Sequence, residues 1–340
     1  MRVALAVAVV MLASSTVWYL ASPPKHYTWP PRDYPNSRVE FFSNETGVII
    51  GPRVLHTQNG GKAWAIIDYI NPTDSFKPKD NPGDAKNLVD FVDPEWAWRV
   101  SPNDPEAVEY SSDGARSWSA PIKTGIKSRT SLVFTSREDG WVLGDVPVVT
   151  HETGRTWREE KALANQRFEY PFFLDRNHGW MANYWGVIAK TTDAGLHWDI
   201  VHTDVKNIRT LFFIDSLSGW AVGANRLVAR TDNGGYDWKI IELSIPLNEK
   251  LEFLDVFFLS RDLGWIAGQD GLILMTKDGG KTWTRASTST RAPLCSIRFT
   301  DPLHGWAVGG NPASPIAVSS PSNVILETND GGENWKAREF

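Results

Sequence analysis

The sequence predicts an all-β chain that folds as a seven-bladed β-propeller of four-stranded antiparallel blades, preceded by an N-terminal signal or membrane anchor. Three observations lead to this prediction. A turn motif ending in tryptophan occurs seven times, with successive tryptophans 54, 39, 41, 40, 45 and 52 residues apart, and a period near forty is typical of propellers. A Gly-Trp marker precedes most of these turns. We find no convincing helical period in the apolar residues after residue 36.

The first residues of the chain predict export. Met1-Arg2 is followed by an apolar run over 3–12, small residues over 13–16 and a second apolar group over 17–21, which is the pattern of a secretory signal. Cleavage after Ala13 or Ser15 fits the preference for small residues. An uncleaved anchor is the alternative, because residues 3–21 approach the length that spans a bilayer. We therefore expect residues 1–21 to be a signal peptide or anchor, and the protein to be exported, either periplasmic or attached to the outer side of a membrane through residues 3–21.

Residues 22–36 contain five prolines, which resist helix and central strand. They predict an extended spacer or an N-terminal tail. The propeller is expected over residues 37–340, with blades at approximately 37–68, 86–119, 126–160, 166–202, 206–243, 250–286 and 293–340. Two insertions, 71–84 and 311–323, interrupt the regular spacing, and long loops on a rigid scaffold often carry function.

The turn motif has the frame Ser/Thr-x-Asp/Asn/Glu-x-Gly/Ala-x-x-Trp and is best represented by residues 276–283. Asp278 is expected to accept hydrogen bonds from N–H groups about two residues further on, Gly280 to adopt a positive φ, and Trp283 to begin the next strand as an apolar anchor. Seven such turns around a ring cannot converge on one substrate, and an aspartate that satisfies local donors needs no ligand. We expect structural turns at Asn59, Asp113, Glu152, Asp193, Asn233, Asp278 and Asp330.

The second marker is a Gly-Trp pair followed mainly by small or aliphatic residues, and it begins at Gly140, Gly179, Gly219, Gly264 and Gly305. In the repeat over 207–241, short runs rich in β-branched and aromatic residues predict strands at 208–214, 220–223, 227–231 and 236–241. The first two repeats depart from the pattern. Val48 stands where the first tryptophan is expected, and the segment 94–98 lacks the preceding glycine.

The pairing of Gly-Trp-Ala-Val-Gly, as at 219–223, with Thr-x-Asp-Gly-Gly-x-Thr-Trp, as at 276–283, resembles the Asp-box propellers, also called bacterial neuraminidase repeat propellers. The closest resemblance is to the photosystem II stability and assembly factor-like family, over roughly residues 38–340. This resemblance implies a non-catalytic propeller that binds a protein client. The photosynthetic members are known for an arginine-rich patch used in that binding.

Composition excludes several other classes. The chain has 35 basic and 40 acidic residues and a net charge of −5, without the basic excess expected of a nucleic-acid-binding protein. Its one cysteine, Cys295, lies in a strand predicted over 294–299, cannot form an internal disulfide, and is expected to be a buried small hydrophobe. The usual zinc, phosphate-loop, dinucleotide and nucleophile-elbow motifs are absent from the sequence. We expect no metal and no cofactor.

The neuraminidase resemblance raises the question of glycoside hydrolysis. The Phe-Arg-Ile/Leu-Pro stretch of such enzymes is absent, and the nearest positions are residues 36–41. Carboxylates on the predicted innermost strands lie near the channel, but sequence does not give the separation of about 5 to 10 Å that glycosidases require. These residues are Glu40, Asp90, Glu169 and Asp255. We expect no enzymatic activity.

Four arginines precede the late aromatic residues of the predicted innermost strands by four to six positions, when those strands are aligned on Phe42, Phe134, Phe173 and Phe213. They are Arg38, Arg129, Arg167 and Arg209. Corresponding strand ends form a ring at one mouth of a propeller, so we hypothesise a positive patch for a carboxylate, a phosphate or an acidic segment of a partner. In the alternative interpretation these are exposed strand starts paired with nearby acids such as Glu169.

The sequence therefore favours a non-catalytic, exported binding or assembly platform for a membrane or envelope protein client. The alternative is a carbohydrate-active enzyme or sugar-binding protein of the sialidase-like Asp-box type, because sugars stack on exposed aromatic rings and the chain has 17 tryptophans. Twelve of them belong to the two markers and are expected to pack inside. The tryptophans whose exposure decides between these functions are Trp29, Trp96, Trp98 and Trp185.

Overall fold

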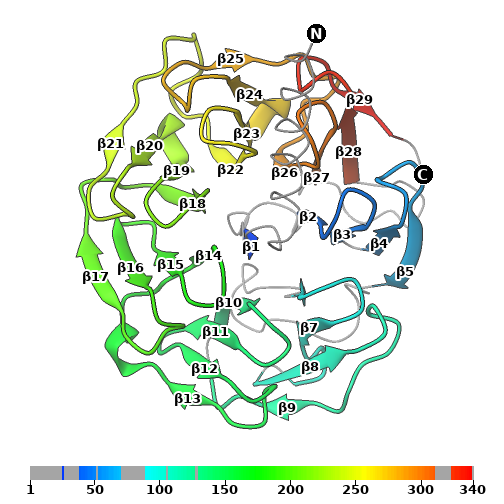
Figure 1. The fold of residues 1–340 in the computed structure, drawn as a ribbon, viewed down its shortest axis with the longest axis vertical. Coiled ribbons are helices and arrows are strands. Elements are labelled where there is room, and N and C mark those ends of the chain that lie inside the picture. Colours follow the sequence, from blue (N-terminus) through cyan, green and yellow to red (C-terminus); the bar gives the residue numbers. More distant parts are fainter. Residues whose placement is uncertain are drawn as a thin grey trace, which may run out of the picture.

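The computed structural model describes residues 25–26, 38–50, 53–69, 89–104, 106–126, 129–310 and 323–338. Their strands form seven antiparallel sheets arranged radially around a central axis (Figure 1). The predicted all-β, seven-bladed propeller is confirmed. The predicted signal or anchor over 1–21 lies outside the described residues, as do Trp29 and the greater part of both insertions.

Each blade runs outward from an innermost strand A to an outermost strand D. The first three blades are β2 (Arg38–Phe41), β3 (Gly47–Ile50), β4 (Arg53–Thr57) and β5 (Ala65–Tyr69); β6 (Val89–Phe91), β7 (Ala97–Val100), β8 (Ala107–Ser111) and β9 (Ile122–Lys123); and β10 (Arg129–Phe134), β11 (Gly140–Gly144), β12 (Val148–Thr150) and β13 (Arg158–Glu159).

The fourth blade pairs four consecutive strands with a short extra one. Its strands are β14 (Tyr170–Phe173), β15 (Gly179–Ala182), β16 (Val187–Thr191) and β17 (Asp199–His202). The extra strand β1 (Lys25–His26) pairs antiparallel with β14, opposite Phe173 and Phe172, and lies at the centre of the ring in Figure 1. This two-residue strand comes from the region predicted as a spacer.

The last three blades repeat the same order. They are β18 (Ile208–Phe213), β19 (Gly219–Gly223), β20 (Val228–Thr231) and β21 (Lys239–Ile240); β22 (Phe253–Phe258), β23 (Gly264–Gly268), β24 (Ile273–Thr276) and β25 (Thr284–Arg285); and β26 (Leu294–Phe299), β27 (Gly305–Gly310), β28 (Asn323–Thr328) and β29 (Lys336–Ala337). The described part of the chain also has three short 3₁₀ turns, η2 (Lys161–Leu163), η3 (Ala224–Arg226) and η4 (Gln269–Gly271).

The fifth blade, β18 to β21, shows how closely the residues specify the strands. The three inner strands match the prediction within one residue, whereas the outer strand predicted over 236–241 is limited to Lys239–Ile240. The innermost strand contains a bulge at Arg209, because Ile208 pairs with Gly223 and Thr210 with Val222. The same irregularity occurs in β10, β22 and β26. Residues counted back from the late aromatic therefore do not correspond between bulged and unbulged blades.

The tryptophan-ended turns are held by a network of two side chains. Thr276 donates its hydroxyl to Asp278 (Oγ1 to Oδ1, 2.8 Å) and accepts the N–H of Gly280 at 2.9 Å. Asp278 accepts the N–H and the hydroxyl of Thr282 at 2.9 and 2.6 Å. We expected an N–H about two residues after Asp278 to be its partner. The partner shown here lies four residues on, because Thr276 takes the N–H of Gly280.

The other copies of the turn repeat this network with different acceptors. Asn59 and Asn233 each use a side-chain oxygen in place of a carboxylate to accept the N–H four residues on, at 2.8 and 2.9 Å. Glu152, with its longer side chain, accepts the hydroxyl of Thr156 at 2.9 Å. The turn therefore requires an oxygen acceptor at this position and does not require a charge.

Aromatic stacking joins neighbouring blades. In six of the seven interfaces, the tryptophan of strand B lies on the late phenylalanine of the next blade's strand A, with ring centroids 3.5 to 4.6 Å apart. The tryptophan of the next blade's turn meets the same phenylalanine edge-on. These pairs are Trp98–Phe134, Trp141–Phe173, Trp180–Phe213, Trp220–Phe258, Trp265–Phe299 and Trp306–Phe41. Burying one such ring contributes about 4 to 6 kcal/mol before the opposing entropy is counted.

The same contact explains the glycine of the turn. A Cβ on Gly332 would lie 2.5 Å from the indole of Trp265, and one on Gly61 would lie 2.6 Å from Trp306. Both glycines also have positive φ, which favours glycine independently. The glycine therefore provides room for the tryptophan of the preceding blade.

The interface between the first and second blades departs from this rule on both sides. Val48 replaces the tryptophan, and the facing turn has Ala115 where the other copies have glycine. Both side chains are buried and belong to one cluster with Phe91. The smaller valine leaves space for the methyl group of Ala115, although that residue has a φ of 68°. The smaller side chain of Val48 is thus compensated by the larger side chain of Ala115 in the next blade.

The ring closes by ordinary blade packing within the described residues. The last blade consists of four strands consecutive in sequence, β26 to β29. Trp306 of this blade packs against Phe41, Val39 and Ile49 of the first blade. The contact between the ends of the propeller is therefore the same as that between its other blades.

We predict that Val48→Trp and Ala115→Gly compensate each other. Val48→Trp alone should lower the free energy of unfolding by about 1 to 3 kcal/mol, because the ring has no room beside the methyl group. In the double variant the loss should be smaller by at least about 1 kcal/mol than the sum of the two single effects. Urea denaturation of the four proteins measures this coupling, and simple addition of the two effects would contradict the packing described.

We predict that Asp278→Ala lowers the free energy of unfolding by about 1 to 3 kcal/mol, because three hydrogen bonds lose their acceptor. Asp278→Asn should cost less, since Asn59 and Asn233 fill the same position elsewhere in the ring. Binding of a client should survive both changes once stability is taken into account. Denaturation and binding measured on the same samples test this. Loss of binding in an Asp278→Ala variant of unchanged stability would contradict the structural role.

The same turns predict loss of stability in acid. Burial opposes ionisation of Asp278, but hydrogen bonds from Thr282 and Thr276 outweigh it and lower its pKa to about 2 from an ordinary 3.8. The pKa values of Asp193 and Asp330 are also lowered to about 2 by hydrogen bonds from the residues four positions on. A lowered pKa stabilises the fold above the ordinary value, and this contribution is lost as pH falls from about 4 to about 2. Asp278→Asn should therefore lose less stability over that range than wild type, and equal losses would contradict the assignment.

Candidate functional site

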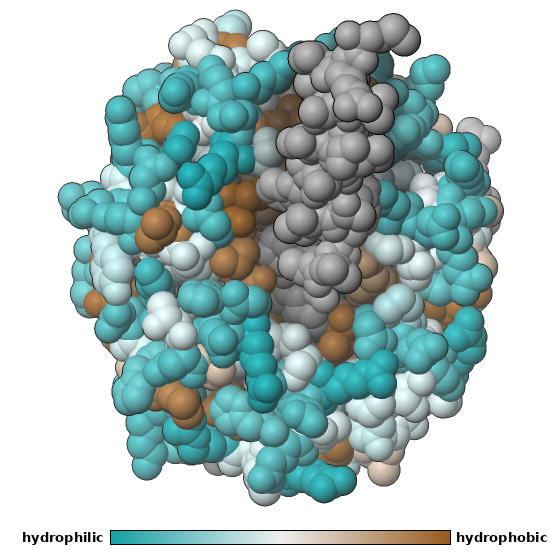
Figure 2. Space-filling view, in the orientation of Figure 1, coloured by the Kyte–Doolittle hydropathy of each residue, from teal (hydrophilic) through white to brown (hydrophobic). Residues whose placement is uncertain are grey.

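The propeller presents two different faces. We call upper the face at which each strand A begins and each strand B ends. These two ends lie together because strands A and B are antiparallel; Leu294, for example, pairs with Gly309. The insertion between β27 and β28, and the one between β5 and β6, join strands that end or begin toward this face. The turns between strands A and B lie on the opposite, lower face. Figure 2 shows hydrophilic residues over much of the ring's periphery, with hydrophobic residues between them.

Three arginines in the turns between strands A and B are paired between blades. Arg137 contacts Asp93 at 2.7 Å, Arg176 contacts Asp139 at 2.9 Å, and Arg261 contacts Asp215 at 2.8 Å. In each pair the arginine lies in the turn between strands A and B of one blade, and the aspartate in the equivalent turn of the preceding blade. These pairs join neighbouring turns. The pairs of Arg137 and Arg261 are partly exposed on both sides, so each contributes little stability, whereas Asp139 is buried.

The four arginines hypothesised to form a mouth occupy different environments. Arg38 is buried, and its guanidinium donates to the backbone oxygen of Val89 and to Asp90, both at 3.2 Å. Arg129 begins β10 and pairs through its backbone with Gly144. Arg167 is exposed in the loop before β14, with a φ of 52°. Arg209 occupies the bulge of β18. The alignment on Phe42 was one residue off, because Phe41 pairs with Gly47 in the position of the other late aromatics.

Two of the four carboxylates considered for catalysis are structural. Asp90 is fully buried and accepts the N–H of Phe134 in the next blade at 2.7 Å, besides contacting Arg38 of the preceding blade. Asp255 is fully buried and accepts the N–H of Ile297 at 2.8 Å and a guanidinium N–H of Arg298 at 2.7 Å. Asp90 therefore links the innermost strands of three blades, and Asp255 links those of two neighbouring blades, within the core of the ring. Glu40 lies on β2 beside Arg38, and Glu169 directly precedes β14.

A polar and aromatic cluster extends over three blades at the upper face. The guanidinium of Arg209 lies 3.4 Å from the hydroxyl of Tyr170, 3.5 Å from a carboxylate oxygen of Glu252, and 5.0 Å from the ring centroid of Tyr184. Burial opposes the charge of Arg209, but Tyr170, Glu252 and Tyr184 outweigh it and raise its pKa. Burial and the charge of Glu169 raise the pKa of Tyr170 to about 12, so its hydroxyl keeps its proton. Arg209 is thus a fixed cation whose side chain is 19% exposed.

Trp185 extends this cluster into solvent. Its side chain is 55% exposed, and its ring meets that of Tyr184 edge-on at 6.3 Å. Tryptophan is enriched among the residues that contribute most to protein binding. Of the tryptophans singled out in the sequence, Trp98 is fully buried as the marker of the second blade, and Trp96 is partly buried and stacked on Tyr110 at 5.1 Å.

The turn that carries Trp185 is fixed by buried Asn183. The side-chain oxygen of Asn183 accepts the N–H groups of Trp185 and Val187, both at 3.0 Å, and its amide donates to the backbone oxygen of Gln166 at 2.7 Å. Gly186 has a φ of 90°, and a Cβ there would lie 2.5 Å from the backbone oxygen of Val205. The turn is therefore rigid before any partner binds, which reduces the entropy lost on binding.

In the part of the chain that the structure describes, no three His, Cys, Asp or Glu side chains are grouped so as to hold a metal ion. None of the helical segments described there has the length and apolar character needed to cross a membrane.

The fold and the repeated turns define the class of protein, a seven-bladed propeller with Asp-box turns. A family model described as "Photosynthesis system II assembly factor YCF48" matches residues 201–295. The resemblance predicted from the repeat markers is confirmed by this match. No curated protein matches the chain.

Solved structures of low sequence identity share the fold. One described as "YCF48 bound to D1 peptide" is 16% identical, with a TM-score of 0.61, covering 91% of this chain and 96% of its own. YCF48 from Cyanidioschyzon merolae is 16% identical, with a TM-score of 0.60, covering 90% of this chain and 98% of its own. A GH74 xyloglucanase from Xanthomonas campestris is 12% identical, with a TM-score of 0.63, covering 92% of this chain but only 55% of its own. At these identities the likeness shows the fold alone.

We predict that Asn183→Ala loosens the turn without unfolding the protein. The amides of Trp185 and Val187 lose their acceptor, so their hydrogen exchange should become about tenfold faster or more. Asn183→Asp keeps an accepting oxygen and should change the exchange less. Exchange measured on the three proteins tests this. Unchanged rates in Asn183→Ala would contradict the role of Asn183 as a positioning residue.

Proposed function

We propose that this protein is a non-catalytic platform that binds a segment of a protein client at its upper face. The observation that carries the proposal is the exposed ring of Trp185 on a turn that Asn183 and Gly186 hold rigid. A rigid, exposed tryptophan gives a partner a large apolar contact at a small entropic cost.

The surroundings of Trp185 suggest the character of the client. Arg167 follows Gln166, whose backbone oxygen accepts from Asn183, so this exposed arginine adjoins the turn. Arg209 contacts Tyr184, the neighbour of Trp185. An apolar side chain flanked by acidic groups would match this surface. Of the four arginines hypothesised to form a mouth, this proposal keeps Arg167 and Arg209 as binding residues. Arg38 instead links the first blade to the second.

The comparisons support a protein client without identifying it. The family model names an assembly factor, and one solved structure of the same fold holds a D1 peptide. The signal-like residues 3–21 support the further proposal that this protein is exported and that its client is a membrane or envelope protein. The proposal concerns the assembly role in general and does not require a photosynthetic host.

One observation favours a second candidate function. Trp185 also offers the exposed ring on which a sugar would stack, and the shared fold with a GH74 xyloglucanase points the same way. Glycoside hydrolysis is less well supported, because Asp90 and Asp255 are both buried and bound to arginines and backbone N–H groups. The second candidate is therefore a sugar-binding protein.

We predict that Trp185→Ala weakens capture of the client at least about tenfold, because one anchoring tryptophan contributes about 2 kcal/mol or more to binding. Leu217→Ala is the matched control, since Leu217 is 52% exposed in a turn of the lower face. Crosslinked pull-down from the native membrane fraction, with variants of equal melting temperature, measures the effect.

Three outcomes of that experiment are distinct. Recovery of the same membrane protein by wild type and Leu217→Ala, but not by Trp185→Ala, would support the platform and its site. Equal recovery by all three proteins would remove Trp185 from the site. Recovery of glycans alone would favour the sugar-binding function.

A further inference from the structure

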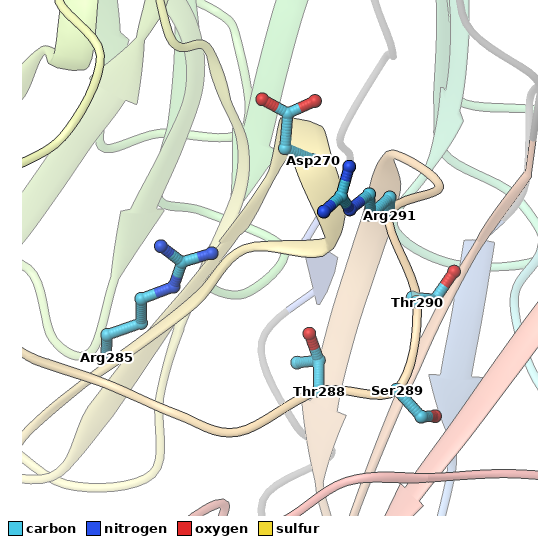
Figure 3. Close-up of a pocket in the computed structure, with 6 residues that line it drawn as sticks. All are labelled: Asp270, Arg285, Thr288, Ser289, Thr290 and Arg291. Atoms are coloured by element: carbon cyan, nitrogen blue, oxygen red, sulfur yellow. The ribbon is translucent and has the colours of Figure 1, made fainter.

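A polar pocket lies between the sixth blade and the connection that leads from it to the seventh, apart from the Trp185 cluster. Its volume is about 580 Å³. One wall is η4, between strands B and C of the sixth blade, and the other is the connection from β25 to β26. The lining residues are Asp270, Arg285, Thr288, Ser289, Thr290 and Arg291 (Figure 3).

The walls of this pocket are fixed by hydrogen bonds and by a close backbone contact. Thr288 donates its hydroxyl to the backbone oxygen of Gly271 at 2.8 Å, and Thr290 accepts the N–H of Ala292 at 3.0 Å. Gly271 has a φ of 66°, and a Cβ there would lie 2.0 Å from the backbone oxygen of Thr290. Ser287 is held by Glu333 and Trp335 of the seventh blade through backbone bonds of 3.0 and 2.9 Å. The pocket is therefore formed before any ligand arrives.

The two arginines of the pocket differ from Arg137, Arg176 and Arg261, which are paired with aspartates. Arg285 and Arg291 are exposed and make no ion pair with any carboxylate in the described ranges. In Figure 3 the side chain of Arg285 lies to the left of Thr288, and that of Arg291 lies above Thr288, near Asp270. Asp270 is the one acidic residue of the lining, so the six residues carry a net charge of +1. Two guanidinium groups without a carboxylate partner favour an anionic ligand.

The loop itself adds donors of a second kind. The N–H groups of Ser289, Thr290 and Arg291 donate no hydrogen bond to any part of the chain that the structure describes. The hydroxyl hydrogen of Thr290 also remains available, because its oxygen acts as the acceptor for Ala292. Successive main-chain N–H groups beside guanidinium groups are a common setting for oxyanions.

We propose that this pocket binds an oxyanion, held between the guanidinium groups of Arg285 and Arg291. A phosphate group and a carboxylate group share the chemistry that these donors recognise. The site is separate from Trp185 and goes beyond the proposed function, so either can fail without the other.

The test is calorimetric titration of the full chain with sodium phosphate and, separately, with sodium glutarate, at constant ionic strength maintained with chloride. Wild type should bind at least one of the two anions, and the Arg285→Gln, Arg291→Gln double variant should bind it at least about tenfold more weakly, because charge-assisted hydrogen bonds are lost. Arg155→Gln is the matched control, since Arg155 is an exposed arginine of a turn in the third blade. Melting temperatures without anion establish that the variants fold.

The outcomes distinguish a phosphate ligand from a carboxylate ligand, and they distinguish this pocket from the proposed binding site at Trp185. Binding of phosphate alone assigns a phosphate group, and binding of glutarate alone assigns a carboxylate. Trp185→Ala should bind the anion as wild type does. The proposal is overturned if neither anion binds to wild type, or if the double variant and Arg155→Gln bind as tightly as wild type.

Discussion

The structure depends above all on the stacking of a tryptophan from one blade on a phenylalanine of the next. Each such pair is completed by the tryptophan of a turn, which meets the phenylalanine edge-on, so three aromatic rings fill one interface. The packing requires a glycine in the facing turn, and the turn needs its own hydrogen-bond network to hold that glycine in place. The recurrent residues of the sequence are thus parts of one interaction, and the contact of Trp306 with Phe41 closes the ring in the same way.

This constraint also limits where function can lie. The marker tryptophans and the turn aspartates are occupied in packing and in local hydrogen bonds, and three arginines of the lower-face turns are paired between blades. Two features of the upper part of the ring are not required by packing. Trp185 is exposed although its turn is rigid, and Arg285 and Arg291 line a pocket without forming an ion pair to a described carboxylate. A rigid ring with these exposed groups is suited to holding another molecule.

The sequence predicted the fold well and the site only in part. The forty-residue period and the two markers sufficed for the blades, because each blade's strands and turns are local in sequence. Arg38 could not be placed, since its partner Asp90 is 52 residues away in another blade. The bulge at Arg209 also shifted the count of residues within strand A. Trp185 was a candidate because it belongs to neither marker, whereas the pocket beside Arg291 depends on the approach of two loops that no motif indicates.

The most direct test of the account is site-specific photocrosslinking in the native membrane fraction, with a photoreactive amino acid at position 185 or at position 217. The account predicts that a discrete protein client is crosslinked from position 185 and not from position 217, because the first lies at the upper face and the second in a lower-face turn. Crosslinking of the client from position 217 alone would contradict the assignment of the binding site to the upper face.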